Sequence, residues 1–243
     1  MRDDYGCHVG RDSQPMSKSE SARSAPNGHS EARLSRASVH RFSLYLRHLQ
    51  RFVREGVQTV SSSQLGEALG ITDAQVRKDL AYLGNLGQPG IGYPAQELIA
   101  ALRQRLGIDR PWATVIVGIG NLARALLRHR GFEQQGFRFV ALFDADAKKV
   151  GQAVDGLEIY GMAQMAEVVS RLGAELGVVA VPAEAAQGVA NALVAAGIRG
   201  ILNFAPTVLR LPPEVSLVAV DLAVQMEQLA FLVHLNEEVD KEG

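Results

Sequence analysis

The chain has 243 residues, of which 47% are hydrophobic, so it exceeds a typical single domain and can bury a core in each of two. Its formal net charge of −1 gives no whole-molecule field for nucleic acid, and any DNA affinity has to come from a local basic face. No apolar run is as long as a membrane span, and the amino terminus lacks the apolar stretch of a secretory signal.

The first segment, residues 1–37, is rich in Ser, Arg, Pro, Asn and Gly without periodicity, which predicts a disordered tail. The single cysteine, Cys7, lies in it and cannot form an internal disulfide, which fits a reducing cytoplasm. An amphipathic helix is predicted over residues 39–54, where Phe42 and Leu46 recur at helical spacing. Its other face carries four arginines that suit contact with DNA phosphates: Arg41, Arg47, Arg51 and Arg54.

Two short capped helices joined by a glycine turn come next, and this is the helix-turn-helix pattern. Ser61 with Gln64 predicts a capping box on the first helix, and Thr72 with Gln75 predicts a second box on the next, with Gly70 at the turn. The exposed face of the second helix carries Ala74, Gln75, Arg77, Lys78 and Tyr82. The glycines that follow predict a hairpin wing ending at Tyr93: Gly84, Gly87, Gly90 and Gly92.

After a linking helix over residues 95–106, short apolar runs alternate with Ala-rich helical stretches. This rhythm predicts repeated βα units around a doubly wound parallel sheet. The predicted strands are Thr114–Val117, Phe137–Phe143, Gly177–Val181, Gly200–Asn203 and Ser216–Val220. The last segment, Asp221–Leu235, is a predicted helix with apolar residues almost all round, which has to be buried in its own domain or against a partner chain.

A dinucleotide-binding fingerprint follows the first of these strands, reading Val115-Ile-Val-Gly118-Ile-Gly120-Asn-Leu-Ala123. Gly118 permits the tight turn, Gly120 lets the backbone approach a pyrophosphate, and Ala123 allows close packing of helix against strand. The amino terminus of the helix then faces the phosphate charge. The segment therefore predicts a dinucleotide site.

An acid, Asp144, ends the next predicted strand. An acid roughly 20 residues beyond the fingerprint binds the ribose 2′-hydroxyl and repels a 2′-phosphate, so Asp144 favours NAD(H) over NADP(H). Lys148 and Lys149 weaken this preference. A turn residue at the end of a strand is the other interpretation of Asp144.

No catalytic constellation accompanies this predicted cofactor site. A dehydrogenase needs a positioned acid–base group, but the chain has no Tyr-x-x-x-Lys pair, and His129 lies at the far end of the fingerprint helix. The lone cysteine and scattered histidines give no zinc-site spacing, so no metal is predicted. The chain is therefore predicted to hold a cofactor without reacting with it.

Together, several segments resemble the bacterial Rex family of redox-sensing transcriptional repressors over about residues 38–235. They are Ser61-Ser-Ser-Gln-Leu, Ala74-Gln-Val-Arg-Lys-Asp-Leu, Gly90-Ile-Gly-Tyr93, Gly118-Ile-Gly-Asn-Leu and Asn203-Phe-Ala-Pro206. The resemblance implies a repressor that binds operator DNA when NADH is scarce and that NADH releases, while NAD⁺ competes but permits binding. It also implies a homodimer with an exchanged final helix. The implied domains are a winged helix over 38–107, a Rossmann domain over 108–220 and a dimerisation helix over 221–243.

Carried over by position, the resemblance implies three groups of site residues. The cofactor-binding residues are Gly118, Ile119, Gly120, Asn121, Leu122, Ala123, Asp144, Lys149, Val181, Pro182, Asn203, Phe204, Ala205 and Pro206. The DNA-binding residues are Ser61, Ser62, Gln75, Arg77, Lys78, Tyr82, Gly90, Gly92 and Tyr93. The residues that couple cofactor to DNA state are Arg41, His129 and Asp221, with Arg41 and Asp221 forming an inter-subunit pair.

The chain departs from the family pattern in three ways. His129 stands where a tyrosine is usual, Leu86 replaces an aromatic residue, and Gln88-Pro89 replaces a basic pair, which removes some phosphate attraction from the wing. Two other functions stay open, because a fold does not determine a function. They are an NAD-dependent oxidoreductase and a CoA-binding protein, each with an accessory winged-helix domain.

Overall fold

The computed structural model describes residues 34–242, and it describes side chains over residues 34–236. Most of the predicted tail, including Cys7, lies outside the described residues. No helix in the described part of the chain is long and apolar enough to cross a membrane.

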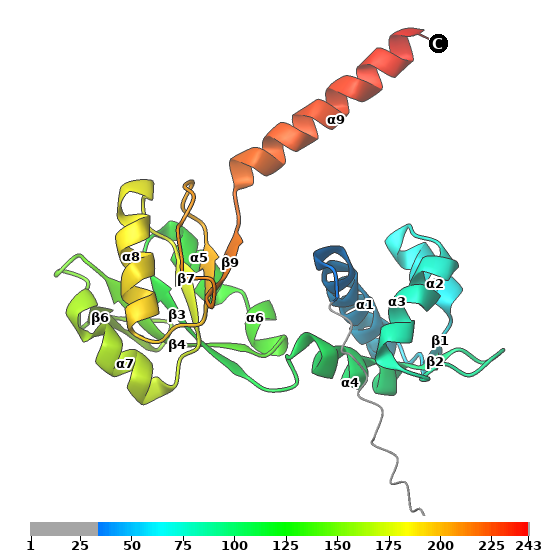
Figure 1. Cartoon of the computed structure of the whole chain (residues 1–243), viewed down its shortest axis with the longest axis horizontal. Helices are drawn as coiled ribbons and strands as arrows, with labels where there is room; N and C mark the ends of the chain where they lie inside the picture. The colour runs from blue at the N-terminus through cyan, green and yellow to red at the C-terminus, as the bar shows by residue number, and fades with distance from the viewer. Residues whose placement is uncertain (1–33, 243) are drawn as a thin grey trace, which may run out of the picture. The chain divides into compact units, whose positions relative to one another are not determined.

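The amino-terminal part consists of helices and a two-stranded sheet (Figure 1). Its elements are α1 (Arg36–Arg54), β1 (Thr59–Val60), α2 (Ser62–Leu69), α3 (Asp73–Leu80), the 3₁₀ turn η1 (Ala81–Leu83), β2 (Tyr93–Pro94) and α4 (Ala95–Leu106). Helix α1 packs along α4, and Phe42 and Leu49 of α1 are fully buried, as are Leu98 and Leu102 of α4. The helical periodicity that predicted α1 therefore marks its core face.

The two predicted capping boxes differ in the structure. On α2, Ser61 Oγ accepts the Gln64 backbone N–H at 3.1 Å, and Gln64 Oε1 accepts the Ser61 N–H at 2.8 Å, which completes the box. On α3, Thr72 Oγ1 accepts the Gln75 backbone N–H at 3.2 Å, but the Gln75 side chain donates to Asp79 instead of closing the box. The second predicted box is therefore wrong, because a buried carboxylate takes the glutamine side chain.

The predicted wing is a short hairpin. Gln88 and Gly92 form an antiparallel bridge, with N–H to carbonyl distances of 2.8 and 3.0 Å. The next residues form β2, which pairs with β1 so that Tyr93 lies opposite Val60, a pairing that the sequence did not predict. Gly92 has a φ of +103°, and a Cβ there would lie 2.7 Å from the Val60 carbonyl oxygen, so the base of the wing requires glycine.

The carboxy-terminal part is built on a seven-stranded sheet of order β5-β6-β4-β3-β7-β8-β9, parallel except for β5. The strands are β3 (Trp112–Val117), β4 (Phe137–Asp144), β5 (Ala153–Val154), β6 (Leu157–Gly161), β7 (Leu176–Val179), β8 (Gly200–Asn203) and β9 (Ser216–Ala219). The helical elements are α5 (Asn121–Arg128), α6 (Gly131–Gln134), the 3₁₀ turn η2 (Met162–Gln164), α7 (Met165–Leu172), α8 (Ala183–Ala195) and α9 (Leu222–Glu242). The five predicted strands are confirmed, but β5 and β6 were not predicted, because β5 has only two residues and Glu158 interrupts the apolar residues of β6.

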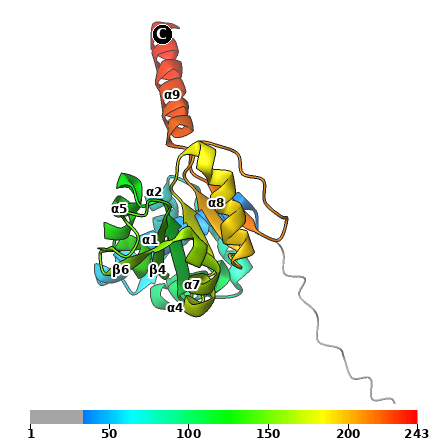
Figure 2. The same ribbon diagram turned by 90° about the vertical axis from the view of Figure 1, so that its left-hand side faces the viewer.

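Helices cover both faces of this sheet (Figure 2). Val115 on β3 packs in a cluster with residues of α7 and α8, whereas its neighbour Ile116 packs on the other face with Ala123 of α5. This alternation is the period of a strand that is buried on both sides. The parallel pairing of β3 with β4 and β7 places their carboxyl ends along one edge, where doubly wound sheets bind ligands.

Two apolar surfaces remain uncovered in the described chain. Helix α9 exposes most of its large side chains, among them Met226 at 65% and Phe231 at 59%. An open apolar cavity of about 350 Å³ also lies against the sheet and α6. It is lined by Phe132, Phe137, Phe139, Leu202 and Val218, among others. A soluble chain rarely leaves surfaces of this kind in contact with water.

Candidate functional site

The fingerprint turn joins β3 to α5, and its two glycines have different roles. Gly118 has a φ of +92°, and a Cβ there would lie 2.6 Å from the Ala180 carbonyl oxygen. Gly120 has an ordinary extended backbone, and a Cβ there would meet no atom within 4 Å. The first glycine is therefore required by the packing of the turn, and the second keeps the space in front of α5 open.

The amino terminus of α5 borders that open space. Gly120 occupies the cap position, and no side chain caps the helix. The first backbone N–H groups of a helix have no partner within the helix, so they are available to an anion. This geometry suits the pyrophosphate of a dinucleotide.

The carboxylate of Asp144 lies at the end of β4 with a side chain that is already bonded. Its Oδ2 accepts the Ile119 backbone N–H at 2.8 Å and the Lys149 ammonium at 2.8 Å, and its Oδ1 accepts the Asp146 N–H at 2.9 Å. Burial raises the pKa of Asp144, but the bonds from Lys149 and the two amides outweigh burial and lower it below its usual range. The group is therefore ionised at neutral pH.

These bonds tie the fingerprint turn to the end of β4 and to the loop that follows it. Lys149 also donates to the Ile119 carbonyl oxygen at 3.3 Å. A carboxylate offers about four acceptor positions, and three are used here. Asp144 therefore has one acceptor position left while it also holds the turn. Its bond to the turn was not evident from the sequence.

A pocket of about 300 Å³ opens at this edge of the sheet. The predicted cofactor residues that line it are Gly118, Ile119, Gly120, Asp144, Lys149, Val181 and Pro182. The lining also contains residues that were not predicted to bind the cofactor: Val117, Ala145, Met162, Ala180, Ala185 and Val189. Met162 follows β6, so the omission of that strand also hid this side of the pocket. The apolar lining beside a few polar groups is typical of a nucleotide site.

The remaining predicted cofactor residues lie elsewhere. Asn203, Ala205 and Pro206 line a separate cavity of about 260 Å³, together with Asp221. The Asn203 amide is buried, and it bonds to Ala205 and Thr207, so it shapes its own loop. The residues that line neither of these two cavities are Asn121, Leu122, Ala123 and Phe204.

The exposed face of α3 forms a candidate DNA-binding surface. Arg77 and Lys78 are exposed, and Tyr82 is 44% exposed. Arg77 donates to Asp73 at 2.6 Å and to Ser62 at 3.3 Å. Such an exposed ion pair contributes little, so Arg77 can exchange Asp73 for a DNA group at small cost.

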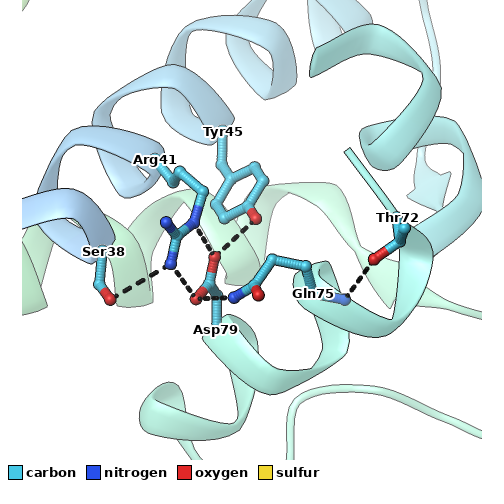
Figure 3. A network of polar contacts seen from close by, with 6 residues as sticks. All are labelled: Ser38, Arg41, Tyr45, Thr72, Gln75 and Asp79. Atoms are coloured by element: carbon cyan, nitrogen blue, oxygen red, sulfur yellow. Dashed lines mark hydrogen bonds and ion pairs between the residues drawn. The ribbon is translucent and has the colours of Figure 1, made fainter. Parts of the chain in front are cut away.

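Behind that face, a buried carboxylate joins α3 to α1 (Figure 3). Asp79 accepts from Arg41 Nε and Nη2 at 2.5 and 2.7 Å, from Tyr45 Oη at 2.9 Å and from Gln75 Nε2 at 2.9 Å. Burial raises the pKa of Asp79, but these donors lower it below its usual range. Burial and the bond to Asp79 raise the pKa of Tyr45 above its usual range.

The three predicted coupling residues all have contacts within the described chain. Arg41 bonds to Asp79 and Ser38. His129 ends α5 and lies edge-on to Phe132 at a ring distance of 5.5 Å. Asp221 caps α9, since its Oδ1 accepts two backbone N–H groups at 2.9 and 3.2 Å. Among the described residues, no group of three His, Cys, Asp or Glu side chains can hold a metal ion.

Comparison with known proteins agrees with both parts. A family model described as CoA binding domain matches residues 109–207, and one described as putative DNA-binding protein N-terminus matches residues 33–81. The redox-sensing transcriptional repressor Rex of Carboxydothermus hydrogenoformans is 45% identical over 199 residues, which are 82% of this chain and 96% of that protein. The chain belongs to the Rex family.

Solved Rex-family structures share the fold. RSP, a Rex-family repressor crystallised with NAD⁺ and operator DNA, superposes with a TM-score of 0.80 at 32% identity, over 86% of this chain and 96% of RSP. The RSP complex with NADH gives a TM-score of 0.76 at 31% identity, over 86% and 99% of the two chains. The predicted fold class, a winged helix-turn-helix followed by a Rossmann-type sheet, is confirmed.

Proposed function

We propose that this Rex-family protein is a transcriptional repressor that binds operator DNA when NADH is scarce and leaves it when NADH binds. The observation that carries the proposal is the pocket at the fingerprint turn. There the amino terminus of α5 has no side-chain cap, and no atom lies within 4 Å of the position that a Cβ on Gly120 would take. RSP has been crystallised with NAD⁺ and operator DNA and with NADH, which supports the same ligands here.

The nicotinamide dinucleotides are sensed rather than transformed. Asp144 and Lys149, the ionisable residues lining the described pocket, bond to each other and leave no acid–base group beside the ligand. This argues against the oxidoreductase alternative. CoA also carries an adenine nucleotide and a pyrophosphate, so it belongs in the experiment as a competing ligand.

The protein acts as a homodimer in the cytoplasm, where operator DNA is found. Both its helix α9 and the open cavity on the sheet are apolar, so in a dimer α9 of one copy can be buried against the cavity of the other. Residues 38–107 bind DNA, chiefly through Arg77 and Lys78, residues 108–220 bind NAD(H), and residues 221–243 hold the dimer together.

The test is operator binding with the cofactor titrated in. Operator duplexes are selected from a random library, and their affinity for the full chain is measured with NADH, NAD⁺ or CoA. We expect NADH to weaken binding by about 5- to 150-fold, with NAD⁺ and CoA having less effect. Since coupling is reciprocal, operator DNA has to weaken NADH binding by the same factor. A wild-type protein indifferent to NADH would overturn the sensor function.

A further inference from the structure

The Asp79 carboxylate, buried behind the DNA-binding face of α3, has a side chain only 2% exposed. It receives bonds from three side chains, two on α1 and one on α3 (Figure 3). Such a group anchors the helix, and it also restricts what its neighbours can present on the other side.

Asp79 restricts the orientation of the side-chain amide of Gln75, which lies one turn earlier on the same helix. An ionised carboxylate only accepts hydrogen bonds, so the part of the Gln75 amide that faces it has to be the NH₂ group. The bond from Gln75 Nε2 to Asp79 Oδ1 is 2.9 Å long. Within residues 34–236, no hydrogen bond is made to Gln75 Oε1, and the contact with Thr72 involves only the backbone N–H of Gln75. The amide therefore has a defined polarity, with an acceptor oxygen left for another molecule.

Arg41 and Tyr45 of α1 hold Asp79 in place, so the orientation of the Gln75 amide is already fixed before DNA binds. Arg41 holds both carboxylate oxygens, and Tyr45 donates a further bond from the core. Both interactions favour the ionised form of Asp79. A carboxylate held in this way cannot rotate away or become a donor without breaking contacts to another helix.

We propose that Asp79 is a positioning residue that orients the Gln75 amide, and that Gln75 thereby reads an adenine and rejects a guanine in the operator. This rests on the proposed operator binding. Adenine offers the N6 donor to Gln75 Oε1 and the N7 acceptor to the second Nε2 hydrogen. Guanine offers two acceptors, and its O6 would face Gln75 Oε1. A flipped amide donates from Nε2 to guanine O6 but then places Oε1 against N7, so a fixed orientation adds to the rejection of guanine.

The experiment measures the affinity of the full chain for a selected operator and for every single-base-pair substitution of it. We compare wild type with Gln75→Ala and Asp79→Asn. Asparagine keeps the shape of aspartate but can donate to Gln75 Oε1 and so permits the flip. For wild type we expect adenine to be preferred over guanine at one position per half-site, by about 5- to 150-fold. Both variants reduce that ratio at the same position and leave the other positions unchanged.

A matched control separates orientation from simple loss of structure. Gln64→Ala removes the capping box of α2 without touching the Asp79 contacts, so its effect should spread evenly over all operators. Overturning results are an even loss for Asp79→Asn on every operator and on unrelated DNA, or an unchanged profile for Gln75→Ala.

A second measurement on the wild type covers the case in which Asp79→Asn fails to fold. The Gln75 side-chain NH₂ resonances, assigned by their absence in Gln75→Ala, should show slow hydrogen exchange in the free protein. Rapid exchange would overturn the proposal. NADH is titrated in the same assays, and a wild type that binds its operator but ignores NADH counts against the sensor function and not against this orientation.

Discussion

The recognition helix and the fingerprint turn are each held by a buried aspartate, and the two differ in where the bonds originate. Asp79 on α3 receives Arg41 and Tyr45, which lie 38 and 34 residues earlier in the chain. Asp144 on β4 receives Lys149 and the Asp146 amide, five and two residues later, besides Ile119 of the turn. The carboxylate on the recognition helix is held from a different helix, whereas Asp144 is held mostly by the loop that follows it and in turn bonds the fingerprint turn 25 residues earlier.

The largest effects are expected at the two glycines of the turn. Gly118→Val should destabilise the protein by about 2–6 kcal/mol, because it combines a positive φ with a collision against the Ala180 carbonyl.

Gly120→Val should fold and bind operator DNA but ignore NADH, because its side chain enters open space in front of α5. Urea denaturation and NADH titration distinguish the two. NADH-driven release of the Gly120 variant would contradict the phosphate site.

Removal of each carboxylate tests the comparison directly. Asp79→Ala should cost about 3 kcal/mol, because it leaves Arg41 and Tyr45 facing a buried site. Asp144→Ala should cost about 1–2 kcal/mol, because Lys149 is 34% exposed and can turn to water. Urea denaturation of both variants gives the difference. Equal costs would mean that local and long-range bonds secure their regions equally.

Asp144→Ala has a second expected effect, on the cofactor. It should weaken NADH binding and narrow the preference for NADH over NADPH, since the lost carboxylate repels a 2′-phosphate and leaves Lys149 without its partner. Calorimetry with both cofactors measures this. Equal affinity of the wild type for NADH and NADPH would contradict it.

Arg77→Ala separates the two functional regions. Operator affinity should fall by about 1–3 kcal/mol, the value of a good arginine–base contact, while NADH affinity stays at the wild-type value. Fluorescence anisotropy with labelled operator and calorimetry with NADH make the measurement. An unchanged operator affinity would remove Arg77 from the interface.

The smallest effect is expected at Asp221. Asp221→Asn keeps an acceptor for the first amides of α9 but removes the charge proposed to pair with Arg41 of a second copy. NADH should still bind, while NADH-driven release becomes weaker. The ratio of operator affinities without and with NADH is compared with wild type. An identical ratio would exclude Asp221 from the coupling.

The sequence by itself determined the features that depend on neighbouring residues. The capping box of Ser61 and Gln64, the glycine turn at Gly118 and the strand pattern of Val115–Val117 each lie within one local segment. Periodicity, capping and turn chemistry operate over that range, so the two-part organisation and the family resemblance could be predicted.

Only the tertiary structure decided where the side chains of those segments make their bonds. Thr72 and Gln75 have the spacing of a capping box, yet Gln75 bonds to Asp79 one turn later on the same helix, and Arg41 and Tyr45 of α1 bind the rest of that carboxylate. Asp144 has the position of a ribose ligand, yet it also holds the turn through Ile119. A polar side chain bonds to the best buried partner in space, and distance along the chain does not reveal which partner that is.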